Sequence, residues 1–326
     1  MNFMPAPGYM PTYNPPLPYS KPVPGGLYPG MSVYVQGTIP HHTKRFRVNF
    51  ACGAQDGADI ALHFNPRFDG KDQVVLNTFE GGKWRKEEHH KMPLNKGQQF
   101  EIVFLVQGDR YQVMVNRGHF CDFKHRIPPE RVQVVDTDGD LELQSMTVLG
   151  GGGMLMGGGG MQAPAYPQMG MPGLGSGYPP SNLPMMSAPT SYHPQVPHVG
   201  NLSGGLGAKS TIVVRGFIPQ DAKSFRINFK AGPSDIALHI NPRINERTVV
   251  RNSFLNGQWG KEERELSYNP FQPGRYFDLS IRCGNEKFKV FADGQPLFNF
   301  KHRYRHFQNI NTIDIDGDVV LSYIQY

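Results

Sequence analysis

The chain has 326 residues, 38% of them hydrophobic, which is enough for two domains with separate hydrophobic cores. No stretch approaches the length of an apolar membrane-spanning segment, so we expect that the chain is not an integral membrane protein. The formal net charge is +6 at pH 7, but Lys and Arg are interspersed with Asp and Glu instead of forming a long basic run, and the sequence therefore argues against a nucleic-acid partner.

The N-terminal segment, residues 1–18, is rich in Pro and Tyr and lacks the charged start and continuous apolar run of a secretory signal. We expect a disordered arm here, and synthesis in the cytoplasm without a signal peptide. The three cysteines, Cys52, Cys121 and Cys283, are scattered along the chain. Their spacing fits neither a disulfide framework nor a metal site, and it is typical of a protein from a reducing compartment.

The strongest pattern in the chain is an internal repeat. The first copy contains "RFRVNF", "ALHFNPRF", "VVLNTFEGGKW" and "DTDGDLELQS", and the second contains "SFRINF", "ALHINPRI", "VVRNSFLNGQW" and "DIDGDVVLSY" in the same order. We therefore predict two copies of one domain, at residues 19–150 and 200–326. The segment between them, residues 151–199, is rich in Gly and Pro and has no Asp, Glu, Lys or Arg, so we expect a flexible linker.

Short runs within each copy alternate apolar and polar residues and end at turn residues. Examples are "MSVYVQG" and "FEIVFLVQGDRYQVMVN" in the first copy and "FDLSIRCGNEKFKVFADG" in the second. This alternation is typical of β-strands, and helical periodicity is absent from the sequence. Strands about ten residues apart predict antiparallel two-sheet sandwiches of jelly-roll type. The predicted fold class is therefore all-β, with two antiparallel β-sandwich domains joined by a disordered Gly- and Pro-rich linker.

One predicted strand in each copy carries a polar side chain at every second position. Alternate residues of a strand point to the same face, so the His, Asn and Arg of this strand form a row. The next predicted strand adds an Asn, and the turn after it is followed by a Trp and, three positions later, a Glu. These residues are His63, Asn65, Arg67, Asn77, Trp84 and Glu87 in the first copy and His239, Asn241, Arg243, Asn252, Trp259 and Glu262 in the second.

This combination of side chains suits a neutral ligand that has many hydroxyl groups and one apolar face, as a sugar does. Asn and Arg donate hydrogen bonds, Glu accepts them, and His can do either, so hydroxyl groups can be satisfied in pairs. A Trp that follows a turn is expected to be partly exposed, and its π face attracts the polarised C–H groups of a pyranose ring. Galactose meets both demands, because its axial 4-hydroxyl leaves one face apolar.

The same residues resemble the pattern of the galectin family, which is His-x-Asn-x-Arg, then Val-x-Asn, then Trp-Gly-x-Glu-x-Arg. The second copy matches throughout and ends the pattern with Arg264. In the first copy Arg85 replaces the Gly after Trp, and His89 replaces the last Arg. The resemblance covers both copies, is similar to the tandem-repeat arrangement of the family, and implies galectin-type domains.

The resemblance implies β-galactoside binding with a defined role for each residue type. It implies that the His, Asn and Arg of the first strand contact the galactose 4-hydroxyl, that the second Asn and the Glu contact the 6-hydroxyl, and that the Trp lies under the ring. It further implies that the Glu and the last residue of the pattern reach the neighbouring sugar. The expected carbohydrate-binding residues therefore include His89 and Arg264 as well.

The two sites are expected to differ in preference. His lacks the planar fork of Arg, so one charge-assisted contact of about 1.5–3 kcal/mol at most is weakened in the first copy. A basic cluster beside this site predicts that it favours sulfated or sialylated galactosides, and a solvated loop is the alternative interpretation. The cluster consists of Arg85, Lys86, His89, His90 and Lys91.

Two such sites on one chain predict a bivalent lectin that cross-links galactose-containing glycoproteins or glycolipids. Each open site is expected to bind weakly, with a Kd roughly in the micromolar to millimolar range. Tight attachment to a glycan-bearing surface therefore depends on both sites binding at once. The resemblance also implies unconventional secretion from the cytoplasm and action outside the cell or at its surface. No cofactor and no obligate oligomer are indicated.

Two other classes of function compete with this interpretation. A glycosidase needs two carboxylates about 5–10 Å apart, and each copy offers only Glu87 or Glu262, so we expect no catalytic residues. No metal site is expected at His63 or His239, because Asn stands two positions further on and Arg follows. A sugar-independent protein-interaction module is the second alternative, and retention on immobilised lactose distinguishes it from a lectin.

Overall fold

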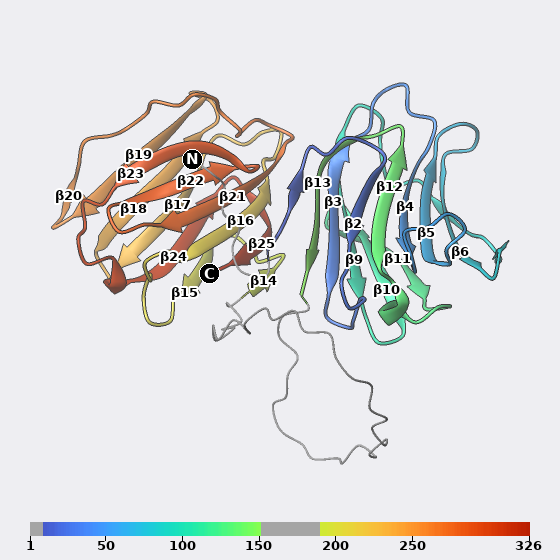
Figure 1. Ribbon diagram of the computed structural model, residues 1–326. Helices are drawn as coiled ribbons and strands as arrows, with labels where there is room; N and C mark the ends of the chain where they lie inside the picture. The colour runs from blue at the N-terminus through green and yellow to red at the C-terminus, as the bar shows by residue number, and fades with distance from the viewer. Residues whose placement is uncertain (1–8, 151–189) are drawn as a thin grey trace, which may run out of the picture.

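The structure is a computed structural model that describes residues 9–150 and 190–326. These residues form four antiparallel sheets, arranged as two β-sandwiches with the same strand order (Figure 1). The predicted all-β class and the two-sandwich architecture are therefore confirmed. The expected disorder of residues 1–8 and 151–189 lies outside the described residues.

The first domain has a back sheet, which faces the second domain, and a front sheet, which faces away from it. The back sheet has the order β1 (Thr12–Tyr13), β13 (Glu142–Leu149), β3 (Ser32–Thr38), β9 (Gln99–Val106), β10 (Arg110–Val115) and β11 (Gly118–Lys124). The front sheet has the order β2 (Tyr19–Pro22), β12 (Val134–Gly139), β4 (Phe46–Ala51), β5 (Ile60–Arg67), β6 (Gln73–Glu80) and β7 (Lys83–Trp84). Strand β8 (Glu88–Lys91) also pairs with β6, and the 3-10 helix η1 (Pro129–Arg131) precedes β12.

The second domain repeats this plan. Its back sheet has the order β14 (Thr190–Tyr192), β25 (Val320–Gln325), β16 (Thr211–Phe217), β21 (Tyr276–Cys283), β22 (Lys287–Ala292) and β23 (Gln295–Lys301). Its front sheet has the order β15 (His198–Asn201), β24 (Ile310–Gly317), β17 (Phe225–Ala231), β18 (Asp235–Arg243), β19 (Thr248–Leu255) and β20 (Gln258–Trp259). The 3-10 helix η2 (Phe307–Asn309) precedes β24.

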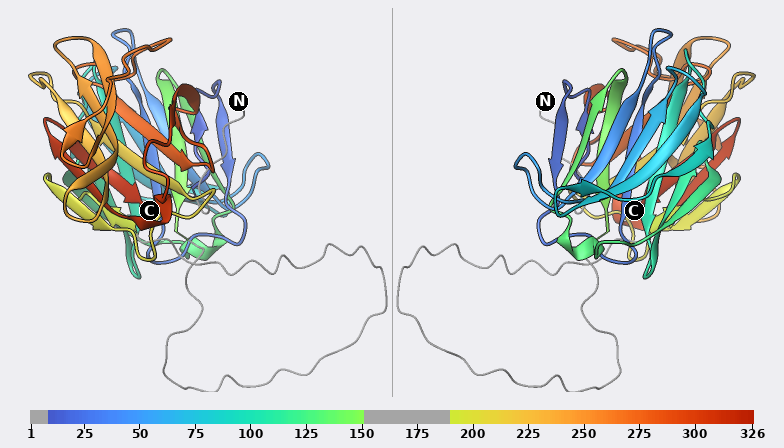
Figure 2. Two further views of the ribbon diagram at one scale, coloured as in Figure 1. Left: turned by 90° about the vertical axis from the view of Figure 1, so that its left-hand side faces the viewer. Right: turned by 90° about the vertical axis from the view of Figure 1, so that its right-hand side faces the viewer.

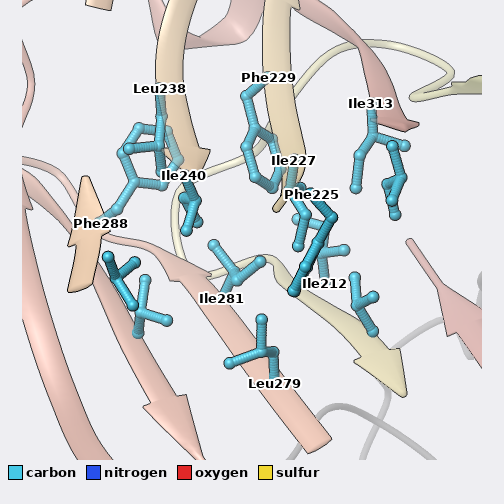
Figure 3. Close-up of a cluster of buried hydrophobic side chains, with 14 of the residues drawn as sticks. Ile212, Phe225, Ile227, Phe229, Leu238, Ile240, Leu279, Ile281, Phe288 and Ile313 are labelled. Carbon is cyan, nitrogen blue, oxygen red and sulfur yellow. The ribbon is translucent and has the colours of Figure 1, made fainter. Parts of the chain in front are cut away.

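The core of each domain lies between its two sheets and follows from the alternation of apolar residues. In the second domain Phe225, Ile227 and Phe229 of β17 point toward Ile281 and Phe288 from the opposite sheet (Figure 3). All five side chains are buried. Burial of a side chain of this size contributes about 1.5–3 kcal/mol, so these rows fix which face of each front strand is turned outward.

The same alternation places polar residues on the outer face of the first domain's front sheet. Leu62 and Phe64 of β5 are fully buried in the core, so the row of His63, Asn65 and Arg67 is turned to the other face. This is the face that carries the predicted polar row.

The segment before the first domain differs from the expected disordered arm. Residues 12–13 form β1, which pairs with β13, and Tyr9 is fully buried. The prediction of disorder is wrong for residues 9–18 because the side chains of Tyr9 and Tyr13 contact the second domain. Composition alone does not reveal these contacts. Likewise, β14 and the start of β15 fall at residues 190–199, which we had assigned to the linker.

The two domains pack back sheet against back sheet. Tyr9, Tyr34, Val103 and Leu149 of the first domain form one buried cluster with Val213 and Tyr323 of the second. The backbone N–H of Tyr276 donates to Oε1 of Gln99 across the contact, at 2.9 Å.

The packing leaves the front sheets at opposite ends of the molecule, with β5 and β6 at one end and β18 to β20 at the other (Figure 1). Figure 2 views the molecule from these two ends, with the second domain in front on the left and the first domain in front on the right. Within residues 9–150 and 190–326, none of the helices is long and apolar enough to cross a membrane.

Candidate functional site

The outer face of the first domain's front sheet contains an open groove. It brings together six of the seven residues predicted for this domain, and His89 lies outside its lining. The groove is lined by Arg45, Phe46, Arg47, His63, Asn65, Arg67, Asn77, Trp84, Glu87, Asp138 and Gly139.

His63 of β5 lies opposite Asn77 of β6 and Asn49 of β4. Its Nδ1 is 2.6 Å from Oδ1 of Asn49, while the Asn49 amide group donates to Asp136 at 3.0 Å. Because an amide oxygen only accepts, Nδ1 of His63 carries the proton and Nε2 is left as an acceptor. Neighbouring strands thus select one tautomer of the groove histidine.

The environment of His63 also keeps the imidazole neutral. Burial, assisted by the charges of Arg67 and Arg47, lowers the pKa of His63 to about 4. At neutral pH the ring is therefore able to accept a hydrogen bond as well as donate one. A neutral, oriented imidazole is suited to a hydroxyl group that donates to it.

Asn65 and Arg67 form a connected pair beside the histidine. Asn65 donates to the carbonyl of Phe46 at 2.6 Å and accepts from Nε of Arg67 at 2.7 Å. Nη2 of Arg67 lies 3.1 Å from Glu87. The guanidinium plane is therefore held from both sides, which leaves its position defined before any ligand arrives.

Trp84 forms one wall of the groove. It follows Gly81 and Gly82, whose φ angles of 58° and 77° form the turn between β6 and β7. Its side chain is 51% exposed and packs against His63, with ring centroids 4.8 Å apart and planes tilted by 58°. The indole ring is therefore partly exposed, as its position after a turn predicts.

Asn77 is positioned by a residue that the sequence analysis missed. Its Nδ2 donates to the carbonyl of Arg85 at 2.9 Å, and its Oδ1 accepts from Arg126 at 3.3 Å. Arg126 also pairs with Glu88 at 2.6 Å. The equivalent Arg303 contacts Asn252 and Glu263 in the second domain, at 2.9 Å in each case. The repeated "KHR" at residues 124–126 and 301–303 is the sequence signal from which both arginines could have been found.

The basic cluster that we predicted beside the first site stands outside the groove lining. Arg85 is largely exposed and pairs with Glu80 at 2.8 Å. His89 reaches only the rim, where its Nε2 lies 3.1 Å from Glu87. Besides Arg67, the arginines that line the groove are Arg45 and Arg47, which the sequence analysis did not select.

The second domain reproduces the geometry of the histidine row. Nδ1 of His239 is 2.6 Å from Oδ1 of Asn228, and burial, followed by nearby arginine charges, lowers the pKa of His239 to about 4. Asn241 donates to a backbone carbonyl at 2.6 Å and accepts from Arg243 at 2.9 Å. Trp259 packs against His239 with ring centroids 5.0 Å apart and is 52% exposed.

The two sites differ in the residues that surround Glu87 and Glu262. Arg264 donates from both Nε and Nη2 to one oxygen of Glu262, at 2.8 and 2.6 Å. The hydrogen bonding from Arg264 is the main reason why the pKa of Glu262 is lowered. Glu246 joins the group at 3.2 Å from Arg264 and 3.3 Å from Arg243. Both sites therefore share an Arg–Glu ion pair, which Arg264 and Glu246 extend into a network in the second site, whereas the first has His89 at this place.

The first groove contains a second carboxylate, which the sequence analysis did not place there. Asp138 lines the groove, and its carboxylate accepts from Arg47 at 2.9 Å. Glu87 likewise accepts from Arg67. Since both carboxylates accept from guanidinium groups, neither is placed as the proton donor that glycoside hydrolysis needs.

An exposed indole beside a row of oriented hydrogen-bonding groups, on the open face of a β-sandwich, defines a carbohydrate-binding protein of the lectin class. Comparison with known proteins identifies the family. A family model described as galactoside-binding lectin matches residues 18–148 and 197–326. The chain belongs to this family, the galectins, and its two family domains make it a tandem-repeat galectin.

The chain is similar over all or nearly all of its length to several named lectins. Galectin-4 of Homo sapiens is 53% identical over 328 residues, and Galectin-4 of Sus scrofa is 54% identical over 331 residues, with 100% of both chains covered in each case. The "32 kDa beta-galactoside-binding lectin" of Caenorhabditis elegans is 33% identical over 312 residues, which cover 95% of this chain and 96% of the relative. The protein is therefore a bivalent β-galactoside-binding lectin and not an enzyme.

Proposed function

We propose that each groove holds one galactose unit through the residues described above, and that the chain cross-links galactose-bearing glycoproteins or glycolipids. The observation that carries this proposal is the repeated pairing of a half-exposed Trp with a neutral His whose tautomer is fixed. It occurs at Trp84 with His63 and again at Trp259 with His239.

For the groove residues we propose the roles that the family pattern implies. Nε2 of His63 accepts from the 4-hydroxyl, while Asn65 and Arg67 donate to it. Asn77 and Glu87 contact the 6-hydroxyl, and the indole of Trp84 supports the C–H face of the ring. His239, Asn241, Arg243, Asn252, Glu262 and Trp259 have the corresponding roles in the second groove, and His89 and Arg264 contribute at the neighbouring sugar.

Retention on immobilised lactose tests this proposal with the whole chain. Replacing both indoles, by Trp84→Leu with Trp259→Leu, should abolish retention, because each groove loses its apolar wall. Tyr28→Leu is a matched control, since Tyr28 is 48% exposed in the first domain and lies outside the groove lining. A double variant that is retained as well as the wild type would contradict the proposal and would favour a sugar-independent interaction module.

The first groove is further proposed to favour anionic galactosides. The support is Arg45, which lines the first groove and forms a backbone β-bridge with Arg67. In the second domain Ser224 forms the equivalent β-bridge with Arg243, so the cation is absent at that position. Nε and Nη2 of Arg45 donate to Asp69, so the remaining N–H groups of its guanidinium group are the ones that offer a charge-assisted contact to a sulfate or carboxylate group. The basic cluster around Arg85 is the competing source of such a preference.

This preference is tested in a Trp259→Leu background, where only the first groove is intact. Titrations with lactose and with a sulfated lactose compare Arg45→Ser with Arg85→Gly, each of which introduces the residue of the second domain. Arg45→Ser should remove the preference for the sulfated sugar and Arg85→Gly should keep it. The reverse result would assign the preference to the basic cluster, and equal affinity for both sugars in the parent would refute it.

Action outside the cell or at its surface is also a proposal, and the display of β-galactosides there supports it. Tagged protein should accumulate in culture medium even when the classical secretory pathway is blocked. Complete intracellular retention under conditions that leave cells intact would contradict it.

A further inference from the structure

The contact between the two domains contains a buried acidic group with an unusual set of partners. Asp278 of β21 is buried, and it pairs in register with the fully buried Arg215 of β16. Nε of Arg215 is 3.7 Å from Oδ2 of Asp278, which is a long contact for a buried ion pair. A buried charge needs additional hydrogen bonds to offset its loss of solvation.

The additional hydrogen bonds come from the N-terminal arm. The hydroxyl of Tyr13 donates to Oδ2 of Asp278 at 2.8 Å, and the hydroxyl of Tyr9 donates to the same oxygen. Burial raises the pKa of the Tyr9 hydroxyl well above its ordinary value, so this group stays protonated and able to donate. Residues at positions 9 and 13 thus both donate to one carboxylate oxygen of a residue 265 or more positions away.

The aromatic rings of the arm are packed as well as hydrogen bonded. Tyr9 is fully buried and stacks on Tyr323 of β25, with ring centroids 5.7 Å apart and planes 12° from parallel. The guanidinium group of Arg215 lies over the ring of Tyr34 from the first domain, 5.0 Å from its centroid. Nη2 of Arg215 also donates to Ser145 of the first domain, at 3.3 Å.

The arm is at the same time part of the first domain. Strand β1 pairs with β13, with Thr12 opposite Met146 and Tyr13 opposite Ser145. We propose that residues 9–13 act as a latch that holds the two galectin domains together back sheet to back sheet. The backbone of the latch is joined to the first domain, and its two tyrosine side chains close on Asp278 and Tyr323 of the second.

The latch determines how the protein is able to cross-link, an inference that rests on the proposed function of the two grooves. With the back sheets in contact, the front sheets and their grooves face away from each other at opposite ends (Figure 1). Such a molecule bridges glycans on two opposing surfaces. Two glycans that lie side by side on one surface are not reached by grooves in this arrangement.

Small-angle X-ray scattering of the full chain tests the latch. Deleting residues 1–13 removes both tyrosines, and deleting residues 1–8 is the matched control because it leaves Tyr9 in place. The first deletion should increase the radius of gyration and the maximum dimension as the domains separate, whereas the control should scatter like the wild type. Equal scattering by all three proteins, or a wild type whose domains are already separated, would overturn the proposal.

A second variant keeps the test valid if the longer deletion folds poorly. Tyr9→Phe with Tyr13→Phe retains the rings and removes only the two hydroxyl groups from Asp278, and it should also shift the scattering toward separated domains. Lactose titration followed by tryptophan fluorescence is measured on the same samples. Lactose binding with unchanged dimensions would refute the latch alone, and separation of the domains without any lactose binding in the wild type would refute the proposed function alone.

Discussion

Each groove histidine is oriented by an asparagine on the neighbouring strand. Asn49 and Asn228 both accept from Nδ1 of their histidine at 2.6 Å. Neither asparagine contacts the sugar in our proposal, so both are positioning residues. Their effect on sugar binding should pass through the tautomer of the histidine.

Replacing Asn49 by Leu should weaken lactose binding at the first groove about fivefold, because the lost hydrogen bond of about 1 kcal/mol no longer selects the accepting Nε2 tautomer. The measurement is calorimetry in the Trp259→Leu background, where only the first groove binds. Asn228→Leu in the same background is the control and should leave the affinity unchanged. Equal affinities for all three proteins would show that Asn49 does not act on the histidine.

The low pKa of the groove histidines predicts a defined pH dependence of stability. His63 and His239 have folded-state pKa values of about 4, below the ordinary value of 6.5. Between these values the unfolded chain binds protons that the folded chain does not, so the free energy of unfolding falls as pH is lowered from 6.5 to 4 and is unaffected by these groups above 6.5. Each histidine contributes up to about 3 kcal/mol to this loss.

Urea unfolding at pH 7, 5.5 and 4 measures this effect. A variant with His63→Gln and His239→Gln should lose less stability over this range than the wild type does, since Gln does not titrate. The same slope for both proteins would contradict the assignment of the low pKa values to these two residues.

At the scale of elements, the turn between β6 and β7 sets the position of the groove tryptophan. Gly82 has a φ of 77°, and a Cβ at this position would meet nothing within 4 Å. Gly82→Ala should therefore lower the free energy of unfolding by about 1 kcal/mol through backbone strain alone. Gly70→Ala is the control, because Gly70 is equally open and has no positive φ. Thermal unfolding that shifts equally for both variants would refute this explanation.

The strands and the polar row were predictable because they depend on local alternation. Once Leu62 and Phe64 are assigned to the core, His63, Asn65 and Arg67 must lie on the other face. Asn49 and Arg126 were missed because their roles depend on which strands become neighbours, and one sequence does not give that pairing. Arg45 was missed for the same reason, since it reaches the groove only through its bridge to Arg67.

The arm and the end of the linker were also missed, although the repeat carried a signal. The stretch "PTYNPPLPY" at residues 11–19 has a counterpart in "PTSYHPQVPH" at residues 189–198, and each contributes an edge strand, β1 or β14. Their Pro-rich composition indicated disorder. Pairing with β13 and β25 outweighs that composition because each segment extends an existing sheet.

At the scale of the whole molecule, the proposed cross-linking requires both grooves at once. Wild-type protein should aggregate lactose-bearing vesicles, and either Trp84→Leu or Trp259→Leu alone should abolish aggregation while one groove still binds lactose. Light scattering of the vesicle suspension measures this, with Tyr28→Leu as the control. Aggregation by a variant with a single groove would mean that self-association, and not the second groove, provides the bridge.

The central claim is that each half of the chain has one galactoside-binding groove with a tryptophan wall. The most direct test is the stoichiometry of lactose binding by isothermal titration calorimetry. We expect two lactose molecules per wild-type chain, one for Trp84→Leu, one for Trp259→Leu and none for the double variant. Two molecules bound by either single variant, or one bound by the wild type, would contradict the account.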